Sequence, residues 1–404
     1  MSSSDPYREP FEAETTHRED DTGQDIGGPS RPENPYSATT ASESGEPIEG
    51  ELLDPRLPAA EPTSLPHPSL GWAILWAGLP LLAQVAVIAS VLVVINNWSP
   101  VAQYRTAEIE EFVNRLNVYL LPLGTLTTVC VALAVVGIGY RGQVASRLAW
   151  RNCTSVQWLG AILLVAPLAI LASEVGNCVA DLLPMIEPDW LREFRESNGE
   201  MFADFVSQPW LLVFLGGCVF PGIGEEIYCR GFLSRGLIAR YGVVAGTLFT
   251  SLLFGAMHVD PLQSCQAFVL GLGLQFVFLT TRSLWAPIAV HTLNNFAAFL
   301  LMSYEEVVPI PGLSSPPADE TVVHTPLLLL GAATVAFLAT AGLLMQTRTR
   351  WVLSDGSPWS PGYPGAEAPP AWVGAQPIAA APHLGLVSLT AAAYALLLAA
   401  LIAG

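Results

Sequence analysis

Three short clusters of ionisable and polar residues interrupt apolar stretches of this sequence. They read E-E-x-x-x-R, F-x-x-x-H and H-x-x-x-N, and consist of Glu225, Glu226 and Arg230, then Phe254 and His258, then His291 and Asn295. Because a charged side chain is costly to insert into a bilayer, an ionisable residue inside an apolar span is a functional candidate. Carboxylates, imidazoles and amides are also the groups that proton transfer, oxyanion stabilisation and metal binding require.

Helical spacing predicts which partners these residues can reach. Residues four apart lie on one face of a helix, so Glu226 can pair with Arg230, and His291 and Asn295 can face the same cavity. Glu225 is five residues from Arg230, which rotates it away from the guanidinium. Glu225 is therefore the less neutralised carboxylate, and we expect it to be the better proton acceptor.

Each cluster taken alone also has a purely structural interpretation. A single histidine in a membrane helix often only hydrogen-bonds to a neighbouring helix. Phe254 alone would be a packing residue, and an acid pair at a helix end is usually solvated. These interpretations do not explain two acids, two histidines and an amide on nearby spans, so the combination favours one shared site.

The rest of the sequence indicates a membrane protein. Of its 404 residues, 51% are hydrophobic and 13% are charged, whereas soluble proteins carry about 25% charged residues. Apolar stretches near the length of about 20 residues that crosses a bilayer occur at 70–96, 117–139, 158–179, 208–229, 243–259, 264–281, 284–302, 326–345 and 384–403. Since lipid offers the backbone no hydrogen-bond partner, we expect an all-α bundle of about eight or nine transmembrane helices.

The arginines predict how this bundle is oriented, since cytoplasmic loops carry the excess of basic residues. Arginines follow the even-numbered spans, at 141–151, 235–240, 282 and 348–350, and acidic residues follow the odd-numbered spans, at 181–204, 260 and 305–320. This alternation predicts nine crossings with the N-terminal segment in the cytoplasm. We expect an integral, multi-pass protein of a bacterial cell (inner) membrane.

The segment 1–66 differs sharply from the rest of the chain. It holds 15 acidic residues against four arginines, out of a net charge of −18 for the whole chain, and it has too few apolar residues to offset chain entropy. We predict a disordered, acidic cytoplasmic tail with no cleavable signal peptide. The predicted parts after the tail are N-terminal transmembrane helices at 67–204, a core at 205–302, and two additional C-terminal helices with Pro-rich loops at 303–404.

Two further features of the composition restrict the partners. No basic surface is concentrated anywhere, so nucleic acid is not an expected partner. The six cysteines form no C-x-x-C pair and lie mostly in or beside apolar segments, which predicts small apolar packing residues rather than metal ligands. Any metal would then have to be held by histidine and carboxylate.

Taken together and in this order, the three motifs resemble the signature of the CAAX-processing and bacteriocin-processing (CPBP) family of intramembrane proteases. This family includes type II CAAX prenyl endopeptidases and bacterial Abi-type proteins. The resemblance covers roughly residues 205–300 and extends to the phrases R-G-F-L at 230–233 and L-W-A-P at 284–287. It implies an intramembrane endopeptidase whose partners are the bilayer and a peptide or lipidated, prenylated-type peptide.

The same resemblance assigns roles to the motif residues. It implies that Glu225 is the catalytic acid and that Glu226 and Arg230 support it. It implies that His258 helps to hold the attacking water. The remaining two motif residues, His291 and Asn295, would complete the site.

Two chemistries stay open at this point. In one, Glu225 takes a proton from water and returns it to the leaving amine, while His291 and Asn295 donate to the oxyanion. In the other, His258, His291 and Glu225 bind Zn²⁺ as a cofactor, which acidifies its bound water. The family is commonly described as metallo-dependent.

The predicted spans leave a conflict in depth. They put Glu225 toward the cytoplasmic end of one helix and His258 toward the opposite end of the next, although a shared reaction needs both at one depth. Pro221, Gly222 and Gly224 suggest the hypothesis that the helix breaks or tilts just ahead of Glu225.

Two other functions fit intramembrane acids and histidines. One is a proton-coupled transporter, although such proteins often contain inverted repeats and none is recognisable here. The other is a non-catalytic immunity or scaffold protein built on the same fold.

Overall fold

The computed structural model describes residues 69–97, 118–140, 144, 148–304, 307, 309–313, 321–359 and 373–403. The predicted tail at 1–66 lies outside these residues, and so do Arg141 and Arg147 of the predicted cytoplasmic loop. The predicted boundaries between the four parts of the chain stay predictions.

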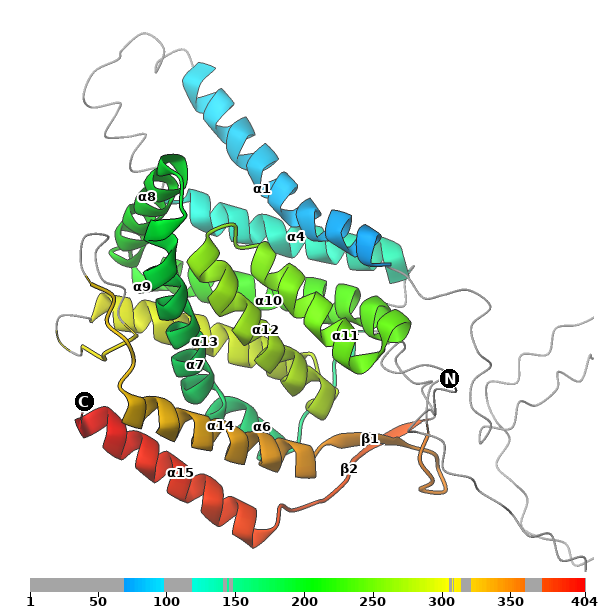
Figure 1. Ribbon diagram of the computed structural model, residues 1–404. Helices are drawn as coiled ribbons and strands as arrows, with labels where there is room; N and C mark the ends of the chain where they lie inside the picture. The colour runs from blue at the N-terminus through cyan, green and yellow to red at the C-terminus, as the bar shows by residue number, and fades with distance from the viewer. Residues whose placement is uncertain are drawn as a thin grey trace, which may run out of the picture. The chain divides into compact units, whose positions relative to one another are not determined.

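The described chain is almost entirely helical (Figure 1). In order, the elements are α1 (Leu70–Asn97), α4 (Leu120–Tyr140), α6 (Ser155–Leu163), α7 (Val165–Leu182), η1 (Leu183–Met185), α8 (Asp189–Val206), α9 (Trp210–Val213), η2 (Phe214–Val219), α10 (Phe220–Tyr228), η3 (Cys229–Leu233), α11 (Ser234–Ala256), α12 (Pro261–Thr281), α13 (Trp285–Ser303), α14 (Leu327–Gln346), β1 (Thr349–Val352), β2 (Gly374–Pro377) and α15 (Leu384–Ala403). The two strands pair antiparallel, with Thr349 opposite Pro377. The short elements η2 and η3 are π-helical and continue the α-helices on either side of them.

Seven helical segments of the described chain are long and apolar enough to cross a membrane. This confirms the predicted all-α membrane fold. One of the seven, Trp210–Ala256, is 47 residues long and contains two predicted spans, 208–229 and 243–259. The predicted span 284–302 is the helix α13, which is not one of the seven.

The long segment turns back on itself at Gly242. Its φ of 81° lies in the left-handed region that only glycine adopts readily. Directly after the turn, a Cβ on Gly246 would lie 2.5 Å from Cα of Ile238, so the two arms touch there. The rings of Tyr241 and Phe249, one on each arm, also pack edge to face at 5.4 Å.

This turn resolves the conflict in depth. Gly242 is 17 residues after Glu225 and 16 before His258, so at a rise of about 1.5 Å per residue the two arms measure roughly 25 and 24 Å and return the chain to one level. The helix runs unbroken through Gly222 and Gly224. The hypothesis of a break at those glycines is therefore wrong, and the predicted end of the fourth span near residue 229 came too early.

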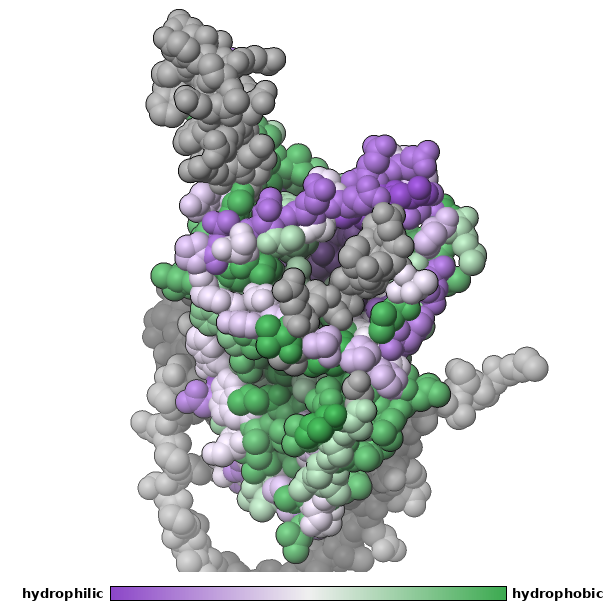
Figure 2. All heavy atoms as spheres, turned by 90° about the vertical axis from the view of Figure 1, so that its left-hand side faces the viewer, coloured by the Kyte–Doolittle hydropathy of each residue, from purple (hydrophilic) through white to green (hydrophobic). Residues whose placement is uncertain are grey.

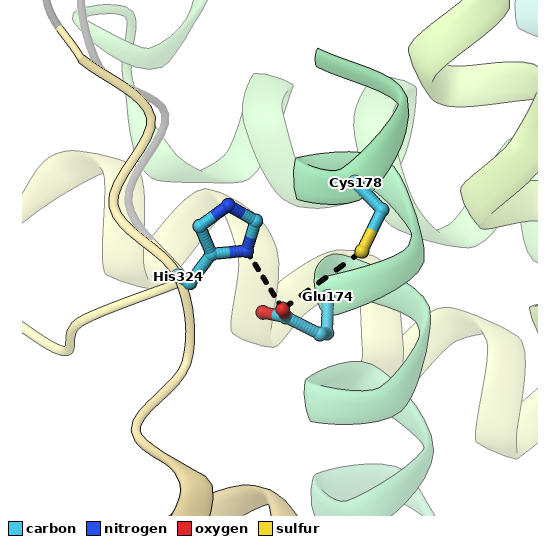
Figure 3. Close-up of side chains that lie close together, drawn as sticks. All are labelled: Glu174, Cys178 and His324. Carbon is cyan, nitrogen blue, oxygen red and sulfur yellow. Dashed lines mark hydrogen bonds and ion pairs between the residues drawn. The ribbon is translucent and has the colours of Figure 1, made fainter. Parts of the chain in front are cut away.

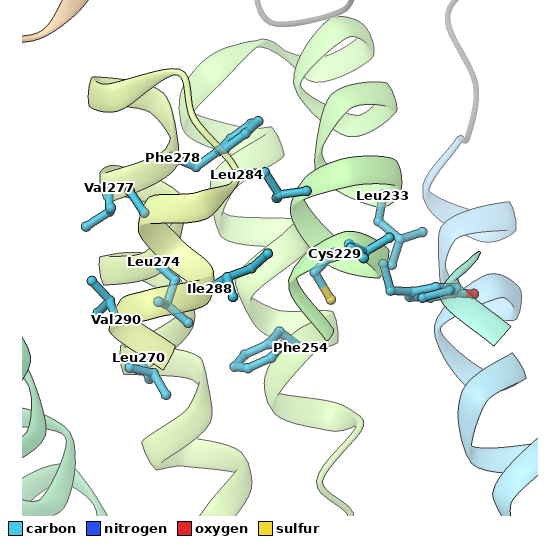
Figure 4. Packing of buried hydrophobic residues seen from close by; sticks show 14 of the residues in the cluster. Cys229, Leu233, Phe254, Leu270, Leu274, Val277, Phe278, Leu284, Ile288 and Val290 are labelled. Carbon is cyan, nitrogen blue, oxygen red and sulfur yellow. The ribbon is translucent and has the colours of Figure 1, made fainter. Parts of the chain in front are cut away.

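The main core lies where η3, α11, α12 and α13 meet (Figure 4). Its buried side chains include Cys229, Leu233, Phe254, Leu274, Val277, Leu284, Ile288 and Val290. Two further helices cover this core, since α4 packs on α10 and α7 packs on α12. A Cβ on Gly224 would meet the backbone of Val129 at 2.9 Å, so a small residue lets α4 and α10 approach closely, as is usual for membrane helices.

The last two long helices form a layer of their own. α14 and α15 pack against each other along an alanine-rich contact made by Ala332, Ala333, Ala336, Ala339, Ala393 and Ala400. α14 also packs on α6 and α7, which attaches the pair to the rest of the bundle. These are the two additional helices that the sequence predicted.

Part of the acidic segment predicted as the loop 181–204 is the amphipathic helix α8. Figure 2 shows hydrophilic side chains gathered in the upper part of one face and hydrophobic side chains below them.

Arg195 connects α8 to neighbouring residues through ion pairs with Glu187, at 2.8 Å, and with Asp260, at 3.8 Å. Asp260 in turn caps α12 by accepting from the N–H of Leu262 at 2.8 Å. The acid that the sequence placed in a loop after the fifth span is thus a helix cap next to His258.

Candidate active site

Glu226 and Arg230 form an ion pair in the interior of the bundle. Both side chains are 0% exposed, and the Arg230 Nη1 donates to Glu226 Oε1 at 2.7 Å. The other terminal nitrogen donates to the carbonyl of Gly271 at 2.8 Å, and the guanidinium lies 4.7 Å from the ring centroid of Phe254. Removing one partner of such a pair leaves an uncompensated buried charge. The 2.7 Å contact between Arg230 and Glu226 agrees with the pairing that their four-residue spacing predicted.

His291 lies between the two glutamates. Its Nδ1 is 3.0 Å from Glu226 Oε1, whereas its Nε2 is 3.9 Å from Glu225 Oε2. An ionised carboxylate only accepts hydrogen bonds, so Nδ1 carries the ring proton, and in the neutral imidazole Nε2 is then an acceptor. Two acceptors, Nε2 and Oε2, thus face each other at a distance too long for a direct hydrogen bond.

Glu225 differs from Glu226 in exposure and in partners. Its side chain is 18% exposed, and its buried Oε2 has no hydrogen-bond partner among the described residues. Glu226 Oε2 also lacks a partner among these residues, but Glu226 Oε1 contacts both Arg230 and His291. Glu225 is therefore the carboxylate without an arginine beside it, as its five-residue offset from Arg230 predicted. It is also the more exposed of the two, since the Glu226 side chain is 0% exposed.

His258 stands on the returning arm, just after the end of α11. Its Nδ1 is 3.0 Å from the carbonyl oxygen of Phe254, which accepts the ring proton and leaves Nε2 as the acceptor of the neutral ring. The chain turns sharply at the next residue, Val259, whose φ is 61°. A non-glycine residue costs roughly 1–2 kcal/mol in this left-handed conformation.

Phe254 connects the parts of the site, although the sequence alone gave it only a packing role. Its ring packs edge to face on His258 at 5.2 Å and on His291 at 5.7 Å, and it lies beneath the guanidinium of Arg230. The only sequence signal for this position was its place four residues before His258.

Asn295 lies one turn beyond His291 on α13, and its side-chain amide donates to the carbonyl of Gly217 at 3.2 Å. This is the one hydrogen bond that the Asn295 amide donates to the described residues, so it leaves the second amide proton without a partner among them. Gly222 sets the distance between α10 and α13, because a Cβ there would lie 2.3 Å from Thr292 Oγ1. The glycine that suggested a helix break therefore permits the close approach that brings His291 to the glutamates.

The donors predicted for zinc converge only in part. The free Oε2 of Glu225 faces His291 Nε2, but Glu225, His258 and His291 do not have ligand atoms that all lie within 4.8 Å of one another. Two of the three donors are thus placed for a shared ion and the third is not. The residues as arranged do not complete a zinc ligand set.

Comparison with known proteins supports the resemblance. A family model described as "Type II CAAX prenyl endopeptidase Rce1-like" matches residues 207–297. The Bacillus subtilis (strain 168) protein named "Putative membrane peptidase YdiL" is 28% identical over 102 residues, which make up 25% of this chain and 41% of that protein. The chain thus covers less than half of the length of this relative. No solved structure matches.

The fold and the site define a multi-pass helical membrane protein with a carboxylate and histidine site inside the bundle. The matched segment carries all six predicted site residues, and the resemblance to the CPBP family is confirmed for this segment.

Proposed function

We propose that this chain is an intramembrane endopeptidase in which Glu225 activates the attacking water. The observation that carries the proposal is the pair of facing acceptors, Glu225 Oε2 and His291 Nε2, at 3.9 Å. Two acceptors at this separation suit a water molecule that donates one hydrogen bond to each. Such a water has its oxygen lone pairs directed away from both acceptors and toward an incoming carbonyl carbon.

The chain's own residues can carry each step of hydrolysis. Glu225 takes one proton from water as the water oxygen bonds to the peptide carbonyl carbon. The second amide proton of Asn295 supports the negative charge that develops on the carbonyl oxygen. Glu225 then gives its proton to the peptide nitrogen as the C–N bond breaks, which leaves a carboxyl product and an amine.

Glu226 and Arg230 act as positioning residues. The Glu226 carboxylate holds the proton on His291 Nδ1 and so fixes which nitrogen faces Glu225. Arg230 compensates the negative charge of Glu226. The uncompensated carboxylate of the site is then Glu225, which is therefore the group that accepts the proton. His258 contacts the same Phe254 ring as His291, and its role of orienting the water stays a prediction.

Zinc would supply a Lewis acid and an acidified water in place of this proton transfer. The incomplete convergence of His258 with the other two donors favours the glutamate-activated water. No step of the proposed mechanism runs through a metal.

The substrate class follows from the surroundings of the site. Glu225 lies near the middle of the first arm of the long apolar segment, between Trp210 and the turn at Gly242, so a peptide must enter the bundle to reach it. We infer a membrane-associated peptide, of the prenylated type that the family resemblance implies. The predicted setting is a bacterial cell (inner) membrane with the N-terminal segment in the cytoplasm.

The test is cleavage of a membrane-anchored peptide library by the purified chain in lipid nanodiscs, with and without a chelator. We expect wild-type protein and the control Glu196→Gln, which changes an exposed acid on α8, to cleave, and Glu225→Gln not to cleave. Cleavage that survives the chelator supports the glutamate mechanism, and cleavage abolished by it supports zinc. Proton-coupled transport lost in Glu225→Gln without any peptidase activity in wild type would identify a transporter. Full biological activity of Glu225→Gln would identify a scaffold.

A further inference from the structure

A second cluster of chemically active side chains lies outside the candidate active site. Glu174 and Cys178 stand four residues apart on one face of α7, and His324 approaches them from the segment just before α14 (Figure 3). The three side chains each offer a ligand atom, and these atoms lie within 4.8 Å of one another. No other group of three such donors is found in the described part of the chain.

The contacts inside this cluster centre on one carboxylate oxygen. His324 Nδ1 lies 2.8 Å from Glu174 Oε1, although 150 residues separate them in the sequence. The thiol of Cys178 lies 4.0 Å from the same oxygen. A nitrogen, an oxygen and a sulfur atom therefore converge on one small volume.

The outer contacts hold these donors in place. His324 Nε2 is 2.8 Å from Asp181 Oδ2, one helical turn beyond Cys178 on α7. Glu174 Oε2 accepts from the backbone N–H of Thr325 at 2.8 Å and from the Asn177 amide at 3.3 Å. A histidine that gives one ring N–H to a carboxylate while its other nitrogen faces a carboxylate and a thiol has the supporting contacts of a metal ligand.

We propose that Glu174, Cys178 and His324 bind a divalent transition-metal ion of the zinc class. The mixed sulfur, nitrogen and oxygen donor set suits Zn²⁺, whereas Ca²⁺ and Mg²⁺ require oxygen ligands. Three protein ligands leave the fourth position of a tetrahedral ion to water. The cluster is open to solvent, since Cys178 is exposed and the His324 side chain is 41% exposed.

The same residues also define what competes with the metal. Hydrogen bonds that His324 donates to Glu174 and Asp181 raise the pKa of His324, so in acid the protonated ring bridges the two carboxylates. Metal binding displaces the proton from Nδ1 and from the thiol, so its affinity falls as the pH falls. The proton and the metal are thus alternative occupants of one site.

The ion would fasten the segment before α14 to α7. That segment already touches α7 through the carbonyl of Gly312, which accepts from Ser173 Oγ at 2.6 Å and from Asn177 Nδ2 at 3.0 Å. A metal ion at this site would therefore stabilise the attachment of α14 and α15 to the core. Both helices lie outside the region matched by the family model. The proposal shares no residue with the proposed catalytic site.

The experiment is titration of the metal-stripped, full-length chain in detergent with Co²⁺, followed by absorption spectroscopy and by competition with Zn²⁺. We expect one Co²⁺ per chain at this site with a sulfur-to-cobalt charge-transfer band, which Zn²⁺ abolishes. Cys178→Ser should remove the band, whereas the matched control Cys130→Ser, at an exposed cysteine of α4, should keep it. Asp181→Asn, which alters only the outer contact, should weaken binding by about 10–100-fold. Glu225→Gln should keep the band, which separates this site from the catalytic one.

Two results would overturn the proposal. One is the absence of a charge-transfer band in folded wild-type protein at saturating Co²⁺. The other is an unchanged band in Cys178→Ser. Should Cys178→Ser fail to fold, Asp181→Asn decides instead, since Co²⁺ affinity equal to that of wild type would contradict the outer-contact geometry on which the site rests.

Discussion

His291 and His324 each stand between two carboxylates, yet the two clusters differ in burial and in closure. His324 is exposed and both of its ring nitrogens lie 2.8 Å from a carboxylate oxygen. His291 is buried, with one nitrogen 3.0 Å from Glu226 and the other 3.9 Å from Glu225. Both ring nitrogens of the exposed His324 are therefore within hydrogen-bond distance of a carboxylate. In the buried His291, the gap between Nε2 and Glu225 Oε2 is long enough for a bridging water.

The counter-charge explains how the buried cluster can exist. Glu226 has Arg230 beside it at 2.7 Å, and an unpaired charge at this depth would cost several kcal/mol. The exposed cluster needs no such partner, because water screens its carboxylates. Under the two proposals, a histidine between carboxylates takes part in catalysis where it is buried beside an arginine, and in metal binding where it is exposed.

The largest expected effect is on turnover at the buried cluster. Glu225→Gln keeps the shape of the side chain but removes the proton acceptor, so the rate of peptide cleavage should fall by about 100–10,000-fold. The amount of folded protein should barely change, as measured by size-exclusion chromatography. Near-normal cleavage by Glu225→Gln together with its loss in folded Glu226→Gln would reverse the roles of the two glutamates.

The next effect is on stability. Glu226→Gln leaves the buried Arg230 without its charged partner, which should lower the free energy of unfolding by about 3–5 kcal/mol. Glu225→Gln is the matched control, since it changes the neighbouring and partly exposed acid. Denaturant unfolding in detergent measures both, and equal stability of the two variants would contradict the buried ion pair.

The distance between α10 and α13 can be changed without touching a charged residue. Gly222→Ala places a methyl group 2.3 Å from Thr292 Oγ1, so the helices must move apart, at a cost of about 1–3 kcal/mol. Cleavage should fall because His291 moves away from the glutamates. The double variant Gly222→Ala with Thr292→Ala removes the closest contact, leaves two backbone contacts at 3.3 Å, and should recover part of the activity. No recovery in a folded double variant would show that Gly222 acts in some other way.

The smallest effect concerns pH at the exposed cluster of the metal-free protein. Hydrogen bonds to Glu174 and Asp181 raise the pKa of His324 in the folded chain. The stabilisation is therefore fully present below the unfolded pKa of about 6.5 and is lost as the pH rises through the higher folded value. Thermal melts across this range should show a pH dependence that His324→Gln removes and His383→Gln keeps. Identical profiles for wild type and His324→Gln would exclude this contact as a source of stability.

Much of the fold followed from the sequence, because span length and apolar composition are local properties. The fourth span shows where this reasoning failed. Arg235 was placed among the cytoplasmic arginines, so the predicted span ended before Arg230 and Arg235, but both side chains are buried. Arg230 is paired with Glu226, and Arg235 lies 6.0 Å from the ring of Phe278. Hydropathy cannot detect a charge that is compensated by a partner inside the bundle.

The candidate site divides in the same way. The pairing of Glu226 with Arg230 was predictable because residues four apart share a helix face. The contact of His291 with the glutamates depends on the close approach at Gly222, and the return of His258 to their level depends on the turn at Gly242. No local spacing encodes either. The exposed cluster was missed altogether, because His324 meets Glu174 across 150 residues and Cys178 was taken for an apolar packing residue.

The most direct test of the central claim follows the oxygen atom of the attacking water. The purified chain would cleave a membrane-anchored peptide in water labelled with oxygen-18, and mass spectrometry would read the new carboxyl terminus of the product. The glutamate-activated mechanism predicts one labelled oxygen per product in wild type and almost no product in Glu225→Gln. Product formed at the wild-type rate by Glu225→Gln, or wild-type product without the label, would contradict it.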